Sequence, residues 1–179
     1  LSGLMCAKRN HLFGILNGID YEEYNPQTDP YIHANFTRKD AQVGKKRNKA
    51  ALQKELSLPV RDDAFLIGVV SRMTAQKGFD LIDYAMEELL NKLDIQVVVL
   101  GTGDGKYENS FRYFQNKYPD QVYAYIGYSE EQAHKIYPSA DVPLMPSQFE
   151  PCGLSQMIAM RYGTLPIVRE TGGLKDTVD

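Results

Sequence analysis

Two cations lie in a short loop, Ser71 to Gly78, that joins an apolar run to a helix-like segment. Arg72 can hold a phosphate through two parallel hydrogen bonds, and Lys77 can act on it as a point charge. The alternative is that Lys77 is solvated and Arg72 pairs with an acidic neighbour. Position alone leaves both open, because a helix start favours anions and accepts cations only beside a bound anion.

A second loop, Phe149 to Leu154, reads Phe-Glu-Pro-Cys-Gly-Leu. Pro151 and Gly153 favour a sharp turn, and the backbone N–H groups of the helix that follows can hold a phosphate. Glu150 can accept hydrogen bonds from sugar hydroxyls, with a cap for its own helix as the alternative role. Cys152 could be a nucleophile, but no histidine stands near it in the sequence, so we interpret it as a small packing residue.

A third loop, Gly101 to Gly105, reads Gly-Thr-Gly-Asp-Gly and resembles a dinucleotide fingerprint only weakly. Lys106 occupies the position of the third glycine, and no acidic residue ends the next strand. A nicotinamide-dependent dehydrogenase is therefore the weaker enzyme hypothesis. We interpret the loop as a tight turn that lets a ligand approach the backbone.

Apolar runs and helix-like segments alternate along the chain from residue 65 onward. We expect strands over 65–70, 95–100, 122–126, 142–145 and 165–168, and helices over 81–90, 107–118, 130–137 and 154–162. This alternation predicts an α/β fold with a doubly wound parallel sheet. Ligands of such sheets bind beyond the carboxyl ends of the strands, where the three loops and a fourth, Arg169 to Leu174, should gather.

The chain changes character upstream of the first strand. Residues 20–36 show no sustained period and indicate an ordered loop, and residues 41–56 indicate a helix that ends before Pro59. We therefore expect an interdomain segment, linker and leading helix over 1–60, and a nucleotide-sugar-binding domain over 61–179. A basic cluster in the leading helix is interpreted as a solvated face and comprises Lys45, Lys46, Arg47 and Lys49.

The composition is that of a globular protein, with 43% hydrophobic and 24% charged residues and a net charge of -3. Such a charge indicates neither a nucleic acid nor a membrane partner. Cys6 and Cys152 are far apart and lack metal-site spacing. No apolar run is long enough to span a bilayer and no leader opens the chain, so we expect a cytoplasmic protein, or a plastidic one in a plant. The chain begins without Met and ends shortly after the start of a predicted helix. We therefore expect a fragment that is incomplete at both ends.

Four segments together are far more specific than any one of them, and the chain resembles bacterial glycogen synthases and plant starch synthases through them. They are Gly14 to Asp20, Arg72 to Gly78, Phe149 to Leu154, and Thr171 to Leu174. That family consists of retaining glucosyltransferases of the GT-B type, with two Rossmann-like domains. The resemblance implies that this chain is the C-terminal, ADP-glucose-binding domain and that the acceptor groove belongs mainly to an N-terminal domain.

The resemblance also implies roles for individual residues. The diphosphate-binding cations fall on Arg72 and Lys77, and the active-site acid falls on Glu150. The aromatic residue that packs on adenine falls on Tyr128, for which a surface tyrosine at a strand end is the alternative. The backbone that contacts sugar and phosphate falls on Cys152, Gly153 and Leu154.

Two positions depart from the family. Ser155 stands where threonine is common and keeps the hydroxyl, and with it the phosphate contact that the resemblance implies. Ile158 stands where many related glycosyltransferases have a second glutamate. The N-terminal-domain Lys-Thr-Gly-Gly-Leu loop is absent, so we expect this chain to be inactive alone.

The implied reaction transfers glucose from ADP-glucose to the non-reducing end of an α-1,4-glucan with retention of configuration, without a metal or other cofactor. Arg72, Lys77 and helix-end N–H groups would stabilise the leaving diphosphate. A binding module for nucleotide or glucan, without turnover, is the non-enzymatic alternative.

Overall fold

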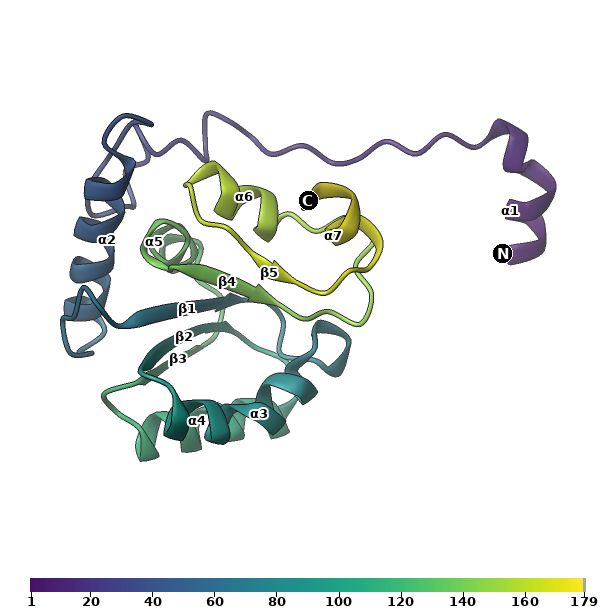
Figure 1. Cartoon of the computed structure of the whole chain (residues 1–179). Coiled ribbons are helices and arrows are strands. Elements are labelled where there is room, and N and C mark those ends of the chain that lie inside the picture. The colour runs from purple at the N-terminus through teal and green to yellow at the C-terminus, as the bar shows by residue number, and fades with distance from the viewer. Residues whose placement is uncertain (179) are drawn as a thin grey trace.

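A parallel five-stranded sheet forms the centre of the protein, as the computed structural model shows for residues 1–178 (Figure 1). The strand order is β3-β2-β1-β4-β5, and every neighbouring pair runs parallel. The strands are β1 (Phe65–Val70), β2 (Ile95–Gly101), β3 (Val122–Ile126), β4 (Val142–Met145) and β5 (Ile167–Val168).

Helices cover both faces of the sheet (Figure 1). Val97 and Val99 of β2 pack against α3 and α4 on one face, while Val98 and Leu100 face α2 and α5 on the other. This alternation follows from the two-residue period of a strand. The α-helices are α1 (Ser2–Lys8), α2 (Ala41–Glu55), α3 (Phe79–Lys92), α4 (Gly105–Lys117), α5 (Glu130–Ser139), α6 (Ser155–Arg161) and α7 (Gly172–Thr177), with 3₁₀ turns η1 (Arg9–His11) and η2 (Ala75–Lys77).

The predicted α/β alternation is confirmed, with differences at the ends of elements. The helix predicted over 130–137 continues to Ser139 because Pro138 lies in its last turn, where its missing N–H removes a single bond. The strand predicted over 165–168 contains only Ile167 and Val168, the residues that pair with β4. Pro166 has no N–H with which to extend the ladder.

The segment upstream of β1 packs against the rest of the domain. Residues 20–36 form the expected ordered loop, and Ile32 and Phe36 of this loop are buried against α5 and α6. Leu52 of α2 belongs to the same buried cluster as Leu66 of β1. The division at residue 60 stays a prediction, and the hydrophobic packing is continuous across it.

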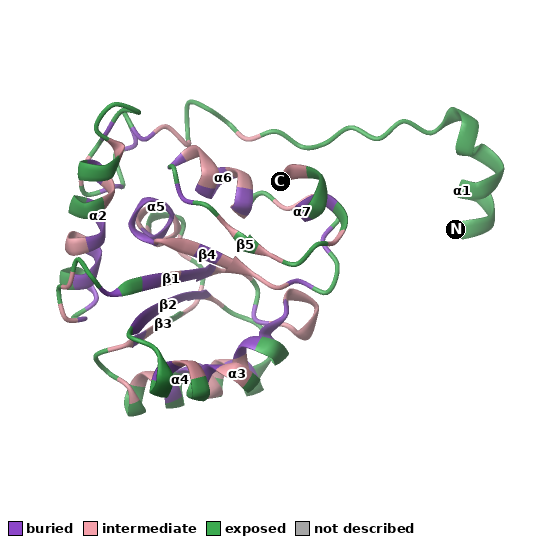
Figure 2. Cartoon of the chain, viewed as in Figure 1, coloured by how far each residue is buried: buried purple, intermediate pink, exposed green. Residues whose placement is uncertain are grey.

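Residues 1–18 are exposed throughout, and α1 lies away from the sheet and its other helices (Figure 2). In contrast, β2 is buried along nearly its whole length, as expected for a central parallel strand (Figure 2). Within residues 1–178, no helix combines the length and the hydropathy that a bilayer crossing requires.

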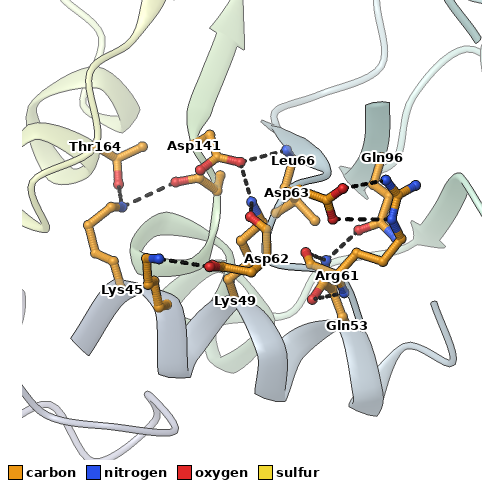
Figure 3. A network of polar contacts seen from close by, with 12 residues as sticks. Lys45, Lys49, Gln53, Arg61, Asp62, Asp63, Leu66, Gln96, Asp141 and Thr164 are labelled. Atoms are coloured by element: carbon orange, nitrogen blue, oxygen red, sulfur yellow. Dashed lines mark hydrogen bonds and ion pairs between the residues drawn. The ribbon is translucent and has the colours of Figure 1, made fainter. Parts of the chain in front are cut away.

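The interpretation of the basic cluster as a solvated face is correct for Lys46 and Arg47, which are exposed, but wrong for Lys49. The Lys49 ammonium is buried and lies 2.7 Å from a carboxylate oxygen of Asp141 (Figure 3). The same oxygen accepts the backbone N–H of Leu66 at 2.7 Å. This ion pair therefore joins α2 to the starts of β1 and β4, at the edge of the sheet opposite to the strand carboxyl ends.

The interpretation is also wrong for Lys45. Its ammonium donates hydrogen bonds to the carbonyls of Pro138 and Ala140, at 3.0 and 3.1 Å, and to the hydroxyl of Thr164 (Figure 3). Carbonyls at the end of α5 lack helix partners, and a lysine satisfies them. Burial lowers the pKa of Lys45 from 10.5 to about 8.

Candidate functional site

The strand order reverses between β1 and β4, so the connections from these two strands leave in opposite directions. Such a switch point creates a crevice beyond the carboxyl ends of the strands, where open α/β sheets bind ligands. The four loops predicted to carry chemistry follow β1, β2, β4 and β5 and therefore lie at this one edge.

The loops after β1 and β2 touch through their backbones. Met73 forms a β-bridge with Gly103, and its carbonyl accepts the N–H of Asp104 at 2.8 Å. A Cβ on Gly101 would lie 1.9 Å from the carbonyl oxygen of Ser71. The glycines of this loop were expected to admit a ligand, but at Gly101 and Gly103 the space beside the backbone is taken by the neighbouring loop.

The loops after β1 and β4 are also in contact. The N–H of Gln148 donates to the carbonyl of Gln76 at 2.9 Å. Gly78 has a φ of 80°, and a Cβ there would lie 2.3 Å from the carbonyl oxygen of Pro146. Both the left-handed backbone and the close approach require glycine at this position.

The side chains of Lys77 and Glu150 meet across these two loops as an ion pair, in which the ammonium donates to Oε2 of the carboxylate. Oε2 also accepts the Ser147 hydroxyl at 3.4 Å, whereas Oε1 has no hydrogen-bond partner within residues 1–178. The side chains of Lys77 and Glu150 are only 17% and 9% exposed. Lys77 is therefore not solvated, and Glu150 is not a cap, since Leu154 occupies the N-cap of α6.

Two glycines of the loop after β5, Arg169 to Leu174, contact the loop that carries Glu150. The N–H of Gly173 donates to the Glu150 carbonyl at 2.9 Å, and a Cβ on Gly173 would lie 2.2 Å from the Cα of Cys152. A Cβ on Gly172 would lie 2.2 Å from the Glu150 carbonyl oxygen. The start of α7 thus fixes the backbone beneath the Glu150 carboxylate.

Arg72 lies in the wall of a pocket of about 290 Å³ at the ends of β1, β2 and β3. Its guanidinium makes no hydrogen bond or ion pair with any residue between 1 and 178. The alternative interpretation, in which Arg72 pairs with an acidic neighbour, is therefore wrong for the described residues. Tyr128 lines the same pocket and is 85% exposed, so one ring face is available to a flat ligand.

The start of α6 carries the remaining predicted donor-binding residues. Gly153 has a φ of 77°, and the Gln156 side-chain amide donates to the carbonyls of Cys152 and Gly153 at 2.9 and 3.1 Å. These bonds hold the turn that leads into the helix at Leu154. The Ser155 hydroxyl, predicted to contact phosphate, accepts the Tyr137 hydroxyl at 3.3 Å and keeps its own proton to donate.

Sequence reasoning missed a buried polar group beside the same pocket. Nδ1 of His134 lies 2.7 Å from Oδ2 of Asp29, and the Tyr162 hydroxyl bonds the same carboxylate oxygen. All three side chains are buried. Asp29 comes from the loop of residues 20–36 and His134 from α5, so no local pattern connects them; the only signal was the place of His134 on the inward face of its helix.

The protein is similar to curated enzymes along its entire length. It is 58% identical to glycogen synthase of Lachnospira eligens over 100% of this chain and 37% of that protein. It is 53% identical to glycogen synthase of Thermotoga petrophila over 99% of this chain and 36% of that protein. The chain therefore spans little more than a third of the length of these relatives.

Solved structures agree with the sheet topology described above. The catalytic domain of starch synthase IV from Arabidopsis thaliana, bound to ADP and acarbose, matches with a TM-score of 0.91 and 41% identity over 99% of this chain and 36% of that chain. Sucrose-phosphate synthase from Thermosynechococcus elongatus matches with a TM-score of 0.58 and 24% identity over 83% of this chain and 34% of that chain, a likeness of fold alone. The predicted GT-B fold and the resemblance to glycogen and starch synthases are confirmed.

The family model for glycosyl transferases group 1 matches residues 53–179. This range contains all five strands and every loop at the switch point. The similarity thus extends over the sheet and over the edge at which Arg72, Lys77 and Glu150 lie. The chain belongs to the glycosyl transferases group 1 family.

Proposed function

We propose that this chain forms the donor site of a retaining glucosyltransferase that transfers glucose from ADP-glucose to the non-reducing end of an α-1,4-glucan. The observation that carries the proposal is the guanidinium of Arg72, which has no partner in residues 1–178 and lies in a pocket at the same edge of the sheet as the buried Lys77–Glu150 pair. The relatives named glycogen synthase and the ADP-bound starch synthase support the choice of donor and acceptor.

The pocket suggests an order for the parts of the donor. Adenine would pack on the exposed face of Tyr128, and the diphosphate would lie between Arg72 and the N–H groups at the start of α6. Lys77 can contribute as well, since an ammonium has three donors and Glu150 uses one of them. Glucose would then lie against Cys152 to Leu154 and the free Oε1 of Glu150.

In this arrangement catalysis is mainly electrostatic. Arg72 and Lys77 would stabilise the charge that grows on the leaving diphosphate, because their positions are fixed before the reaction by the contacts between loops. Glu150 would accept hydrogen bonds from glucose hydroxyls and steady the positive charge that develops on the sugar ring. The acceptor glucan would bind mainly to a domain outside this chain.

Calorimetric titration of the chain tests the donor site. We expect ADP and ADP-glucose to bind with or without EDTA, because Arg72 and the remaining donors of the Lys77 ammonium can hold the diphosphate. They should bind more tightly than UDP or NAD, as the ADP-bound starch synthase suggests. Arg72→Ala should weaken ADP binding by about 10–150-fold, the effect of one hydrogen bond to a charged group. Arg47→Ala, an exposed arginine of α2, is the matched control.

Three outcomes would contradict the proposal. Binding of ADP that is lost with EDTA and restored by Mg²⁺ would show that a metal, not Arg72, neutralises the diphosphate. NAD binding that exceeds ADP binding would favour a dehydrogenase. Binding of ADP-glucose without glucosyl transfer by the complete protein would reduce the function to that of a binding module.

A further inference from the structure

Three potential metal ligands lie together where the loop of residues 20–36 meets the start of α5. The ligand atoms of Glu23, Glu130 and His134 are all within 4.8 Å of one another. Glu130 and His134 also line the pocket that contains Arg72. No local pattern in the sequence indicates this cluster, because Glu23 and Glu130 are far apart in the chain.

The histidine is the reason to consider this cluster a metal site, because it contributes a buried nitrogen without a hydrogen-bond partner. His134 is 1% exposed, and its Nε2 is a buried atom without a hydrogen-bond partner in residues 1–178. A buried polar atom without a partner is costly and uncommon in native proteins. Nε2 lies 4.0 Å from Oε1 of Glu23, beyond hydrogen-bond distance.

The contact of the other ring nitrogen selects the tautomer of a neutral His134. Nδ1 lies 2.7 Å from Asp29, whose carboxylate also accepts the N–H of Tyr31 at 2.9 Å and the hydroxyl of Tyr162. With Nδ1–H donated to this buried carboxylate, the neutral ring keeps its lone pair on Nε2. Metal-binding histidines commonly donate their second nitrogen to a carboxylate in this way.

Aromatic contacts hold the imidazole in place. Tyr24 stacks on the ring at a centroid distance of 4.9 Å, and Tyr31 meets it edge-on at 5.1 Å. These contacts hold the ring so that Nε2 keeps its direction and is not turned toward a hydrogen-bond donor elsewhere. The two carboxylates lie on exposed residues and can move toward it.

We propose that His134, Glu23 and Glu130 bind a divalent cation such as Zn²⁺. One imidazole nitrogen and two carboxylates, with water in a further position, form a ligand set suited to this ion. Zn²⁺ bonds of about 2.0–2.2 Å place tetrahedral ligand atoms about 3.4 Å apart. The separation between Nε2 and Glu23 needs to shorten by roughly half an ångström, which rotation of an exposed glutamate side chain provides.

The ion would clamp the loop of residues 20–36 onto the first turn of α5. The ion would lie in the wall of the pocket, which Tyr24, Glu130 and His134 all line. The role is structural and separate from the proposed reaction, whose donor site uses cationic side chains. Failure of ADP to bind would leave the cation site intact, and failure of Zn²⁺ to bind would leave the donor site intact.

The test uses Zn²⁺ and Co²⁺ without nucleotide, on the chain with Cys6→Ser and Cys152→Ser, which removes competing thiolates. We expect one equivalent of Zn²⁺ by calorimetry and visible d–d absorption with Co²⁺. Glu23→Gln and Glu130→Gln should each weaken binding by at least about tenfold. Glu22→Gln, the exposed neighbour, should change it less than twofold.

Thermal unfolding adds a second measurement. Zn²⁺ at about a hundredfold excess over its Kd should raise Tm by roughly 5–10 °C, and the rise should shrink in Glu130→Gln. X-ray absorption should show one imidazole nitrogen and oxygen ligands. His134→Gln can perturb folding because the residue is buried, so circular dichroism must accompany it. Binding that is unchanged in both glutamate variants, or no binding at all, would overturn the proposal.

Discussion

Removal of one partner from the Lys77–Glu150 ion pair should destabilise the domain by much more than removal of an exposed pair. Both side chains are largely buried, and within residues 1–178 the Glu150 carboxylate has only the Ser147 hydroxyl as a second donor. Lys77→Met leaves this carboxylate in a poorly hydrated site without its counterion. Breaking a buried pair in this way costs about 3–5 kcal/mol.

Lys77 is partly exposed, so some water can reach the unpaired Glu150 carboxylate in Lys77→Met. We therefore expect this variant to lose about 3 kcal/mol of unfolding free energy, the lower end of the range. Glu150→Gln should cost about 1–2 kcal/mol, since the amide oxygen still accepts from the ammonium. The double variant leaves no unpaired charge and should cost about 2 kcal/mol, less than the two single losses together. The coupling energy is then about 2–3 kcal/mol.

Urea unfolding followed by circular dichroism measures all four proteins of this cycle. The matched control is the cycle of Lys92 and Glu88, an i,i+4 pair on α3 whose side chains are 69% and 66% exposed. The coupling energy of that pair should be about 0.3–0.5 kcal/mol. A loss in Lys77→Met of about 3 kcal/mol corresponds to a fall in Tm of roughly 6–12 °C.

Equal coupling in the two cycles would refute the reasoning, because it would mean that Lys77 and Glu150 are as well hydrated as a surface pair. A change in the slope of unfolding against urea would indicate altered denatured-state compactness and must be absent for the comparison to hold.

Three further predictions concern single residues. In the complete protein, Glu150→Gln should lower kcat by about 10²-fold, while ADP should bind the chain at least as tightly in calorimetry, because the amide competes less than the carboxylate for the Lys77 ammonium. The pKa of Lys45 falls from 10.5 in the unfolded chain to about 8, so the native state binds fewer protons. Stability should therefore rise with pH between these values, by about 2 kcal/mol from pH 7 to 9.5 relative to Lys45→Met, measured by urea unfolding. Gly173→Ala should cost about 1–3 kcal/mol and weaken ADP binding, because its Cβ meets the Cys152 backbone, whereas Gly105→Ala, with open space around it, should be neutral.

Local patterns predicted the sheet because each strand had its own signal. The runs that became β1 and β2 are apolar apart from Gln96, as two-sided burial favours, and the segment between them repeats apolar residues at helical spacing. The short strand β5 was predicted too long because strand length depends on the partner. Ile167 and Val168 pair with Leu144 and Met145 of β4, and Pro166 has no N–H to extend this pairing.

The basic cluster on α2 shows what local patterns leave out. Its spacing is that of a solvated helix face, but the acceptors of Lys45 and Lys49 belong to α5, to Thr164 and to Asp141. These groups arrive only when the chain folds back on itself. A lysine beside the carbonyls at a helix end is stabilised there, and the sequence of α2 contains no sign of that helix end.

The candidate site was likewise predictable only in part from the sequence. The loops were predicted to meet because parallel strands share one carboxyl edge, and the structure brings them together there. Which cation would pair with Glu150 was not predictable, because Arg72 and Lys77 lie in the same loop and both can reach across the crevice. The 3₁₀ turn η2 decides it by placing Lys77 toward the loop after β4.

The pairing has a consequence for donor binding under the proposed function. Lys77 and Glu150 neutralise each other, so Arg72 supplies the only uncompensated side-chain charge among these three residues. A diphosphate bears more negative charge than one guanidinium offsets, and the N–H groups of α6 add only partial charges. Binding of the donor therefore favours a shift of the Lys77 ammonium toward phosphate. That shift would release Glu150 Oε2 as a second acceptor for glucose hydroxyls, so that the carboxylate is fully available only when a nucleotide sugar is present.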